Sequence, residues 1–286
     1  MSFDLDDYQR SVTPVQTNDL DFDAFRNQPL SADTLRCLRY MHDVESHTVC
    51  YLRDLLVTSS HADPRITGFL TMWNYEEHWH GVALGKVLNA HDEVAGMARI
   101  APMRARLGWR DRLSPLTNAL GSVLVGTDFV ALHMTWGAVN EWSTQTGYER
   151  LAARAGHPVL TTLLERIGRQ EARHIAFYAT EARERLGRSA KARRITRWAL
   201  DKLWAPVGSG VMPPGEAEFL MGHLMGGGDG RVAAQRIDRN IHRLPGLDDL
   251  SIVTRALNRY GIHSGGEVQS ASGGEFRWRP LLNTPG

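Results

Sequence analysis

The chain has 286 residues, of which 42% are hydrophobic and 23% are charged, and its formal net charge at pH 7 is +1. This composition is typical of one large soluble domain, and the small net charge excludes whole-molecule attraction to nucleic acid or an anionic membrane. We expect no membrane span and no secretory signal, because no long apolar run is evident and the amino terminus is acidic. With two cysteines, Cys37 and Cys50, and no C-x-x-C motif, we expect a cytoplasmic protein without disulfides.

Helical periodicity and the lack of strand alternation predict an all-α chain. The predicted elements, in chain order, are an irregular arm over residues 1–30, long helices over about 31–57 and 63–89, an arginine-rich helix or helical hairpin over 91–115, and long helices over about 115–155 and 158–187. Ser31 or Asp33 can cap the first long helix. Asp63-Pro64 is predicted to start the second long helix, since a capping carboxylate precedes proline at the first helical position.

The rest of the chain is also expected to be helical. Shorter helices are predicted over residues 190–204, 215–225, 231–243 and 247–260. We therefore expect residues 31–187 to form a four-helix bundle, residues 188–265 to form a helical extension of the same domain, and residues 266–286 to form an irregular tail.

Two short motifs of the form Glu-x-x-His stand out, one on the second long helix and one on the fourth. Residues three apart share one face of a helix, so each motif directs a carboxylate and an imidazole to one point. Two such motifs, with one further glutamate from each of two other helices, form the ligand set of a dimetal site in a four-helix bundle. The predicted metal ligands are, in helix order, Glu45, Glu77 with His80, Glu141, and Glu171 with His174.

Each of the four glutamates lies in the middle of an apolar helical stripe, where a solvated residue is not expected. Burying unpaired carboxylates costs several kcal/mol and adds mutual repulsion, whereas two divalent cations balance the four charges. A single Glu-x-x-His often arises by chance on a solvated helix, so the positions are informative only jointly. Four other acids lie away from the centre of the stripes and are expected to be supporting or solvated groups: Asp43, Glu76, Asp128 and Glu165.

Mixed carboxylate and imidazole ligands suit iron or manganese better than a metal that prefers thiolates. We therefore expect two iron ions, with an iron–manganese pair as the alternative. Six ligands for two ions leave coordination positions open, so dioxygen is the expected co-substrate and an external donor is expected to supply electrons.

These motifs resemble those of the soluble acyl-carrier-protein desaturases and their actinobacterial relatives in the ferritin-like superfamily. The family's Glu-Glu-x-x-His-Gly reads Glu76-Glu77-His78-Trp79-His80-Gly81 here, its Glu-x-x-Thr reads Glu141-Trp142-Ser143-Thr144, and its Asp-Glu-x-Arg-His reads Gln170-Glu171-Ala172-Arg173-His174. The resemblance covers roughly residues 31–186 and implies the same six metal ligands. It also places Thr144 as a hydroxyl beside the oxygen-binding face, although Thr144 can instead bond the backbone of its own helix. Gln170 replaces an acid that would orient a ligand histidine or carry electrons inward.

The resemblance implies an O2-dependent di-iron oxidoreductase, and an acyl desaturase is the first hypothesis. A di-iron hydroxylase or N-oxygenase of a small metabolite would use the same oxygen chemistry, so the shape of the pocket should separate the two. An iron-handling ferroxidase and a metal-free helical interaction protein are the further alternatives. The expected partners are an acyl chain or small-molecule substrate, an acyl carrier protein, a reductase or ferredoxin, and a second copy in a homodimer.

A basic stretch follows the second Glu-x-x-His motif. Its members are Arg183, Arg185, Arg188, Lys191, Arg193, Arg194, Arg197 and Lys202. Acyl carrier proteins are acidic, so this stretch is a candidate docking surface. The other interpretation is a solvated helix face, which is the more frequent role of such runs.

Overall fold

Residues 3–262 are described by a computed structural model, and within that range the regular elements are helices, without a strand. The helices are α1 (Leu5–Ser11), α2 (Ala24–Asn27), α3 (Ala32–Leu56), α4 (Pro64–Asn89), α5 (Met97–Val125), α6 (Phe129–Ala155), α7 (Pro158–Arg188), α8 (Ala190–Leu203), α9 (Glu216–Met225), α10 (Gly227–His242) and α11 (Ile252–Arg259). Two short 3-10 turns, Ser59–Ala62 and Gly126–Asp128, precede α4 and α6. The all-α prediction is confirmed for this range.

The predicted starts of the first two long helices are confirmed, because both depend on local capping. The Ser31 side chain accepts a hydrogen bond from the Thr34 amide at the start of α3. The Asp63 carboxylate accepts one from the Arg65 amide at the start of α4, with Pro64 at the first helical position. These side chains satisfy amides that have no partner within the helix.

The predicted start of the third long helix near Pro115 is wrong. Pro115 lies inside α5, and α6 begins at Phe129, after Gly126 ends α5 with a φ of 75°. Proline at position 115 cannot donate to the carbonyl of Asp111, four residues earlier. That carbonyl instead accepts hydrogen bonds from Arg53 (3.0 Å) and from the Ser114 hydroxyl (2.9 Å), so the helix continues through the proline.

Other predicted boundaries also differ from the structure. The arm over residues 1–30 is not wholly irregular, since it contains α1 and α2. Helix α10 begins at Gly227, before the predicted residue 231, and α11 begins at Ile252, after the predicted residue 247. The tail predicted over residues 266–286 lies outside the described residues.

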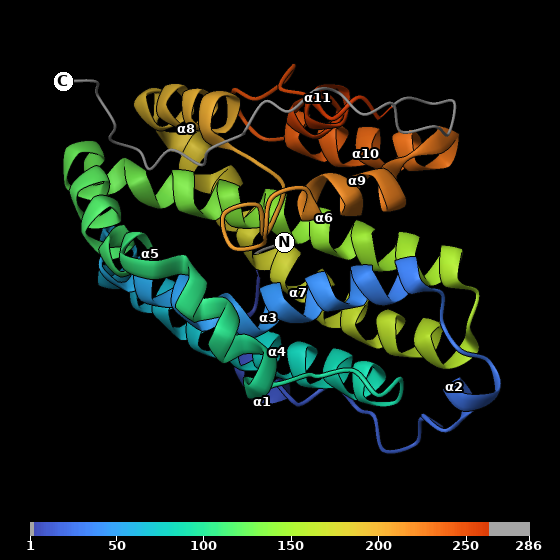
Figure 1. Ribbon diagram of the computed structural model, residues 1–286. Coiled ribbons are helices and arrows are strands. Elements are labelled where there is room, and N and C mark those ends of the chain that lie inside the picture. Colours follow the sequence, from blue (N-terminus) through green and yellow to red (C-terminus); the bar gives the residue numbers. More distant parts are fainter. Residues whose placement is uncertain (1–2, 263–286) are drawn as a thin grey trace.

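Four long helices surround a common interior. Helix α3 packs against α4 and α6 packs against α7, while α4 also contacts α7 and α3 also contacts α6. Helices α8 to α11 lie along one side of this group, next to α6, and α5 crosses another side, next to α3 (Figure 1). A Cβ atom at Gly137 of α6 would lie 2.4 Å from the ring of Tyr178 on α7, so only glycine permits this close approach.

By length and composition alone, one helical stretch within residues 3–262 qualifies as a candidate membrane span. It covers residues 111–155 and therefore runs from α5 through the turn at Gly126 into α6, with a third of its most apolar window buried. Core helices of soluble proteins pass the same test. The absence of a membrane span stays a prediction.

Candidate metal centre

The structure brings all six predicted ligands together in the interior between α3, α4, α6 and α7. They form two overlapping groups of four residues. Within each group, one ligand atom from every residue lies within 4.8 Å of the ligand atoms of the other three. The first group is Glu45, Glu77, His80 and Glu171, and the second is Glu77, Glu141, Glu171 and His174. All six side chains are buried, and Glu77 and Glu171 belong to both groups. Each group is one that can hold a metal ion.

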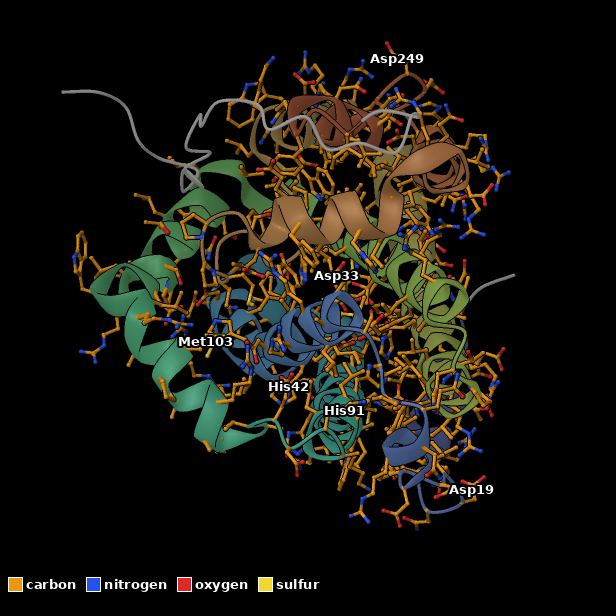
Figure 2. All side chains as sticks on the ribbon, turned by 45° about the vertical axis from the view of Figure 1, so that its right-hand side comes forward. Asp19, Asp33, His42, His91, Met103 and Asp249 are labelled. Carbon is orange, nitrogen blue, oxygen red and sulfur yellow. The ribbon has the colours of Figure 1, made fainter. Side chains whose placement is uncertain are left out.

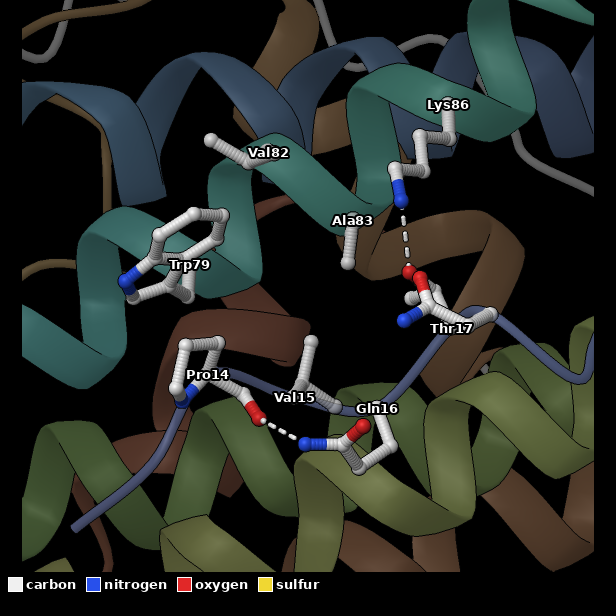
Figure 3. Close-up of a pocket in the computed structure, with 9 residues that line it drawn as sticks. Pro14, Val15, Gln16, Thr17, Trp79, Val82, Ala83 and Lys86 are labelled. Atoms are coloured by element: carbon white, nitrogen blue, oxygen red, sulfur yellow. Dashed lines mark hydrogen bonds between the residues drawn. The ribbon is translucent and has the colours of Figure 1, made fainter.

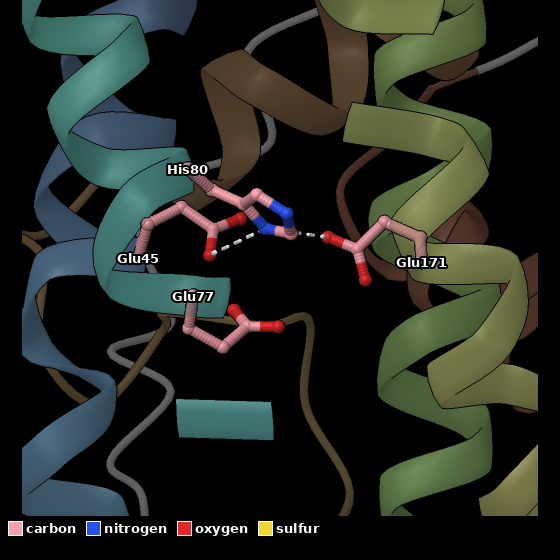
Figure 4. Close-up of side chains that lie close together, drawn as sticks. All are labelled: Glu45, Glu77, His80 and Glu171. Atoms are coloured by element: carbon pink, nitrogen blue, oxygen red, sulfur yellow. Dashed lines mark ion pairs between the residues drawn. The ribbon is translucent and has the colours of Figure 1, made fainter. Parts of the chain in front are cut away.

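The distances within the centre are short. Nδ1 of His80 lies 3.3 Å from Glu171 and 3.9 Å from Glu45. Figure 4 shows these side chains, which extend from α4, α7 and α3, respectively. Nδ1 of His174 lies 3.0 Å from Glu171, 3.2 Å from Glu77 and 3.8 Å from Glu141. Each histidine therefore faces carboxylates from at least two helices with the same ring nitrogen.

The other ring nitrogen of each histidine is held by the residue that precedes the glutamate of the opposite motif. Nε2 of His80 donates to the amide oxygen of Gln170 (2.9 Å), and the amide nitrogen of Gln170 donates to the Thr13 carbonyl (2.9 Å), which fixes the orientation of the amide. Nε2 of His174 donates to Glu76 (2.9 Å). With each Nε2 held as a donor, each Nδ1 is the ring nitrogen that can offer a lone pair to a metal ion.

Outer contacts hold the carboxylates. The Tyr8 hydroxyl donates to Glu76 (2.8 Å), and Arg173 pairs with the same carboxylate. The Tyr148 hydroxyl donates to Glu45, and the Trp73 indole donates to Glu141 (3.0 Å). Sequence reasoning did not find the roles of Tyr8 and Thr13, because no local spacing links the amino-terminal arm to α4 or α7.

Without a cation, the electrostatics of this interior are unfavourable. Burial and the charge of Glu171 raise the pKa of Glu77 to about 7 and that of Glu141 to about 8. Burial and the nearby Glu77 raise the pKa of Glu45 well above its usual range. For Glu171, burial acts upward, but the adjacent imidazoles of His174 and His80 hold its pKa below the usual range. Without a cation, Glu45, Glu77 and Glu141 therefore resist ionisation in the folded protein.

Unpartnered polar atoms show that the residues present fit metal ions. Oε2 of Glu45, Oε1 of Glu77, Oε1 of Glu171 and Nδ1 of His80 are buried and have no hydrogen-bond partner among the described residues. All four atoms belong to the first group of ligands. Leaving such atoms unpaired costs free energy, and coordination of a cation removes that cost.

A mainly apolar pocket reaches the centre from the side of the carboxy-terminal helices. Its lining includes Glu45, Thr144 and Tyr148 from the bundle, together with Leu220 and Leu224 of α9. Ser143 and Thr144 both line the pocket, and the Ser143 hydroxyl donates to the Val139 carbonyl within α6. Thr144 therefore shares a pocket with one predicted metal ligand.

A second pocket lies between the amino-terminal arm and α4, with Trp79 and Val82 on one side and Pro14 and Gln16 on the other (Figure 3). Lys86 donates to the Thr17 hydroxyl across it (2.6 Å). None of the six predicted ligands lines this pocket. It is therefore separate from the metal centre.

The four competing acids take other places. Glu76 is fully buried and supports His174, so it belongs to the outer contacts of the centre. Asp43 pairs with Arg99, Asp128 lies 3.7 Å from Lys191, and Glu165 is exposed. Glu76 is thus a supporting group and Glu165 is solvated, whereas Asp43 is buried in an ion pair and Asp128 is half-buried.

Several side chains of the basic stretch form ion pairs or hydrogen bonds within the molecule. Arg185 pairs with Asp63 and Glu181, and Arg197 pairs with Asp249. Arg193 donates to the Leu186 carbonyl (2.8 Å). These contacts favour the solvated-face interpretation over a dedicated docking surface, which stays a prediction.

Comparison of the chain with profiles of known protein families, with curated proteins and with solved structures found no match. The case for a metal centre therefore depends on the geometry and burial of the residues described above.

Replacing Gln170 with leucine is expected to weaken one metal position while the other is retained. The substitution removes the acceptor that orients His80, and loss of such a contact typically lowers metal affinity about 10–100-fold. Metal titration of the purified variant, followed by elemental analysis, measures the change. Gln145→Leu is the matched control, because Gln145 also bonds a backbone carbonyl, that of Gly168, away from the centre. Equal affinities in the two variants would contradict the role of Gln170.

Proposed function

We propose that this chain is an oxygen-activating di-iron oxidase of the ferritin-like superfamily, with α3, α4, α6 and α7 as its four-helix bundle. The observation that carries the proposal is the pair of buried ligand groups that share Glu77 and Glu171. Shared carboxylates between two such groups are the arrangement that bridges two metal ions in helical bundles. The imidazole and carboxylate donors suit iron, with manganese as the alternative for one position.

The residues of the chain would have distinct roles at this centre. Glu45 and His80 would hold one ion, Glu141 and His174 the other, and Glu77 and Glu171 would bridge them. When bound, a pair of ferrous ions supplies electrons to dioxygen and provides an oxidant strong enough for unactivated C–H bonds. The Tyr148 hydroxyl donates a hydrogen bond to Glu45, and the Trp73 indole donates one to Glu141. These two bonds keep the carboxylates oriented.

We propose an acyl chain as the substrate, because the pocket that reaches Glu45 is lined mainly by apolar side chains. Met41, Val44, Leu220, Met221 and Leu224 contribute to that lining. Such walls exclude water and favour an aliphatic group over a small polar metabolite. Thr144 lines this pocket three residues after Glu141, and its hydroxyl is proposed to face the oxygen-binding side.

We propose that electrons come from a separate reductase or ferredoxin. The chain has two cysteines, Cys37 and Cys50, and both are free. Two cysteines are too few to bind an iron–sulfur cluster through four thiolates. The proposed enzyme would thus act as the terminal oxidase of a short electron-transfer chain.

The test is anaerobic loading with ferrous iron, followed by oxygen and an acyl group linked to an acyl carrier protein. Loss of two hydrogen atoms from the acyl group, detected by mass spectrometry, supports the desaturase. Gain of one oxygen atom identifies a hydroxylase instead. Oxygen consumption that deposits ferric iron without changing any organic substrate, together with assembly into a hollow shell, would establish the ferroxidase alternative.

A further inference from the structure

Helix α5 turns a polar face toward the protein and an apolar face outward, which is the reverse of a core helix. After a kink at Gly108, where φ is 67°, its inner face is polar. Arg53 of α3 donates to Ser114 (3.2 Å) and contacts Asp111, and the Ser122 hydroxyl bonds that of Ser59 (2.6 Å). The face toward the protein is therefore held by hydrogen bonds rather than by apolar packing.

The outer face of the same segment is apolar. We call its large exposed side chains the apolar stripe: Trp109, Leu113, Leu116, Leu120, Val123 and Leu124. Steps of four and three residues place all six on one side of the helix. Each exposes between 42% and 78% of its surface, so the stripe as a whole faces away from the core. Contiguous exposed patches of this kind mark binding surfaces.

Positive charge accompanies the apolar stripe. The sequence of α5 contains five arginines and a single acid, Asp111, which faces inward to Arg53. Arg106 and Arg112 are exposed and have no ion pair among residues 3–262. At the other end of the helix, Lys191 donates to the Val125 carbonyl (2.9 Å) and lies 3.7 Å from Asp128, which balances its charge. The unbalanced charge near the stripe is therefore that of Arg106 and Arg112. Figure 2 shows α5 at the edge of the molecule, with side chains that point away from it.

We propose that α5 binds the surface of an anionic lipid bilayer, with the apolar stripe inserted at the boundary of the acyl chains. Arg106 and Arg112 would then lie at the level of the lipid phosphates. Helices with tryptophan and leucine on one face and arginine beside them lie in the plane of such interfaces. The polar inner face remains bonded to α3, so the helix lies on the membrane and does not cross it.

A bilayer fits the stripe better than a second copy of the chain does. The stripe covers sixteen residues, from Trp109 to Leu124, and is therefore about 24 Å long on a single helix. With a helix width of about 10 Å, its footprint is far below the ~800 Å² that each partner buries in a stable protein interface. The unpaired arginines add an attraction that a neutral or basic protein partner would not satisfy.

The experiment is co-sedimentation of the full chain with phosphatidylcholine vesicles that contain or lack phosphatidylglycerol. Wild type is expected to bind the anionic vesicles at least about tenfold more tightly than the neutral ones, and high salt is expected to weaken this binding. Leu116→Ser combined with Leu120→Ser should reduce binding by at least about tenfold, since both side chains point outward and the fold does not depend on them.

A matched pair of valines separates the stripe from general surface hydrophobicity. Val123→Ser lies in the stripe and should weaken vesicle binding, whereas Val232→Ser, on the exposed face of α10, should leave it unchanged. Failure of wild type to bind anionic vesicles would overturn the proposal, as would equal binding by the double leucine variant. A dimer that the double variant converts to a monomer, without effect on vesicles, would assign the stripe to a second copy instead.

Discussion

Replacing Glu171 with glutamine is expected to remove stable binding of both metal ions, whereas Glu45→Gln or Glu141→Gln should affect one ion each. Glu171 belongs to both ligand groups, and the other two glutamates belong to one group apiece. After anaerobic loading with ferrous iron and desalting, wild type should retain about two ions per chain. The Glu171 variant should retain less than about one, because glutamine lacks the bridging charge.

The control for this experiment is Glu165→Gln. Glu165 lies on the same helix, nearly two turns before Glu171, but it is exposed and outside both ligand groups. It should keep the metal content of wild type. Full metal occupancy in a folded Glu171→Gln variant would refute the proposed bridging role.

The metal-free protein is expected to lose stability as the pH rises from about 4.5 to 8, and Glu141 is expected to cause part of that loss. Folding raises the pKa of Glu141 from the ordinary 4.5 to about 8, through burial and the charge of Glu171. A raised carboxyl pKa stabilises the folded state at low pH, and this contribution disappears as the pH passes through the folded value. The slope is about 1.4 kcal/mol per pH unit for one such group.

Urea unfolding of chelated protein at several pH values measures this slope. Glu141→Gln should make the free energy of unfolding less dependent on pH, because the amide does not titrate. Wild type loaded with metal should also show the weaker dependence, since coordinated carboxylates are already ionised. Parallel pH profiles for chelated wild type and Glu141→Gln would show that Glu141 ionises normally in the folded chain.

The features that could be predicted from the sequence are those with local causes. Ser31 and Asp63 cap helices within three residues of themselves, so the starts of α3 and α4 followed directly. The pairing of Glu77 with His80 needs only helical spacing, and the apolar neighbours of each glutamate indicated an interior position. The convergence of the six ligands agrees with that reasoning.

The features that could not be predicted depend on distant partners. Pro115 was predicted to start a helix because proline is favoured at the first helical position. The helix continues through it because Arg53, on another helix, donates to the Asp111 carbonyl. The outward stripe of α5 has the same period as a core stripe, and only the tertiary structure shows which face meets the protein. The hydrogen bond that the Tyr148 hydroxyl donates to Glu45 depends on the packing of α3 against α6, which local spacing does not show.

The contacts of the amino-terminal arm have a consequence for the order in which the protein matures. Tyr8 and Thr13 support the partners of both histidines, while the last ligand, His174, is translated more than 160 residues later. During synthesis, therefore, no emerging chain that ends before α7 holds a complete donor set. Binding of the proposed metal ions would therefore follow the docking of α7 against α4 and the arm, so the metal would be added to a nearly finished fold.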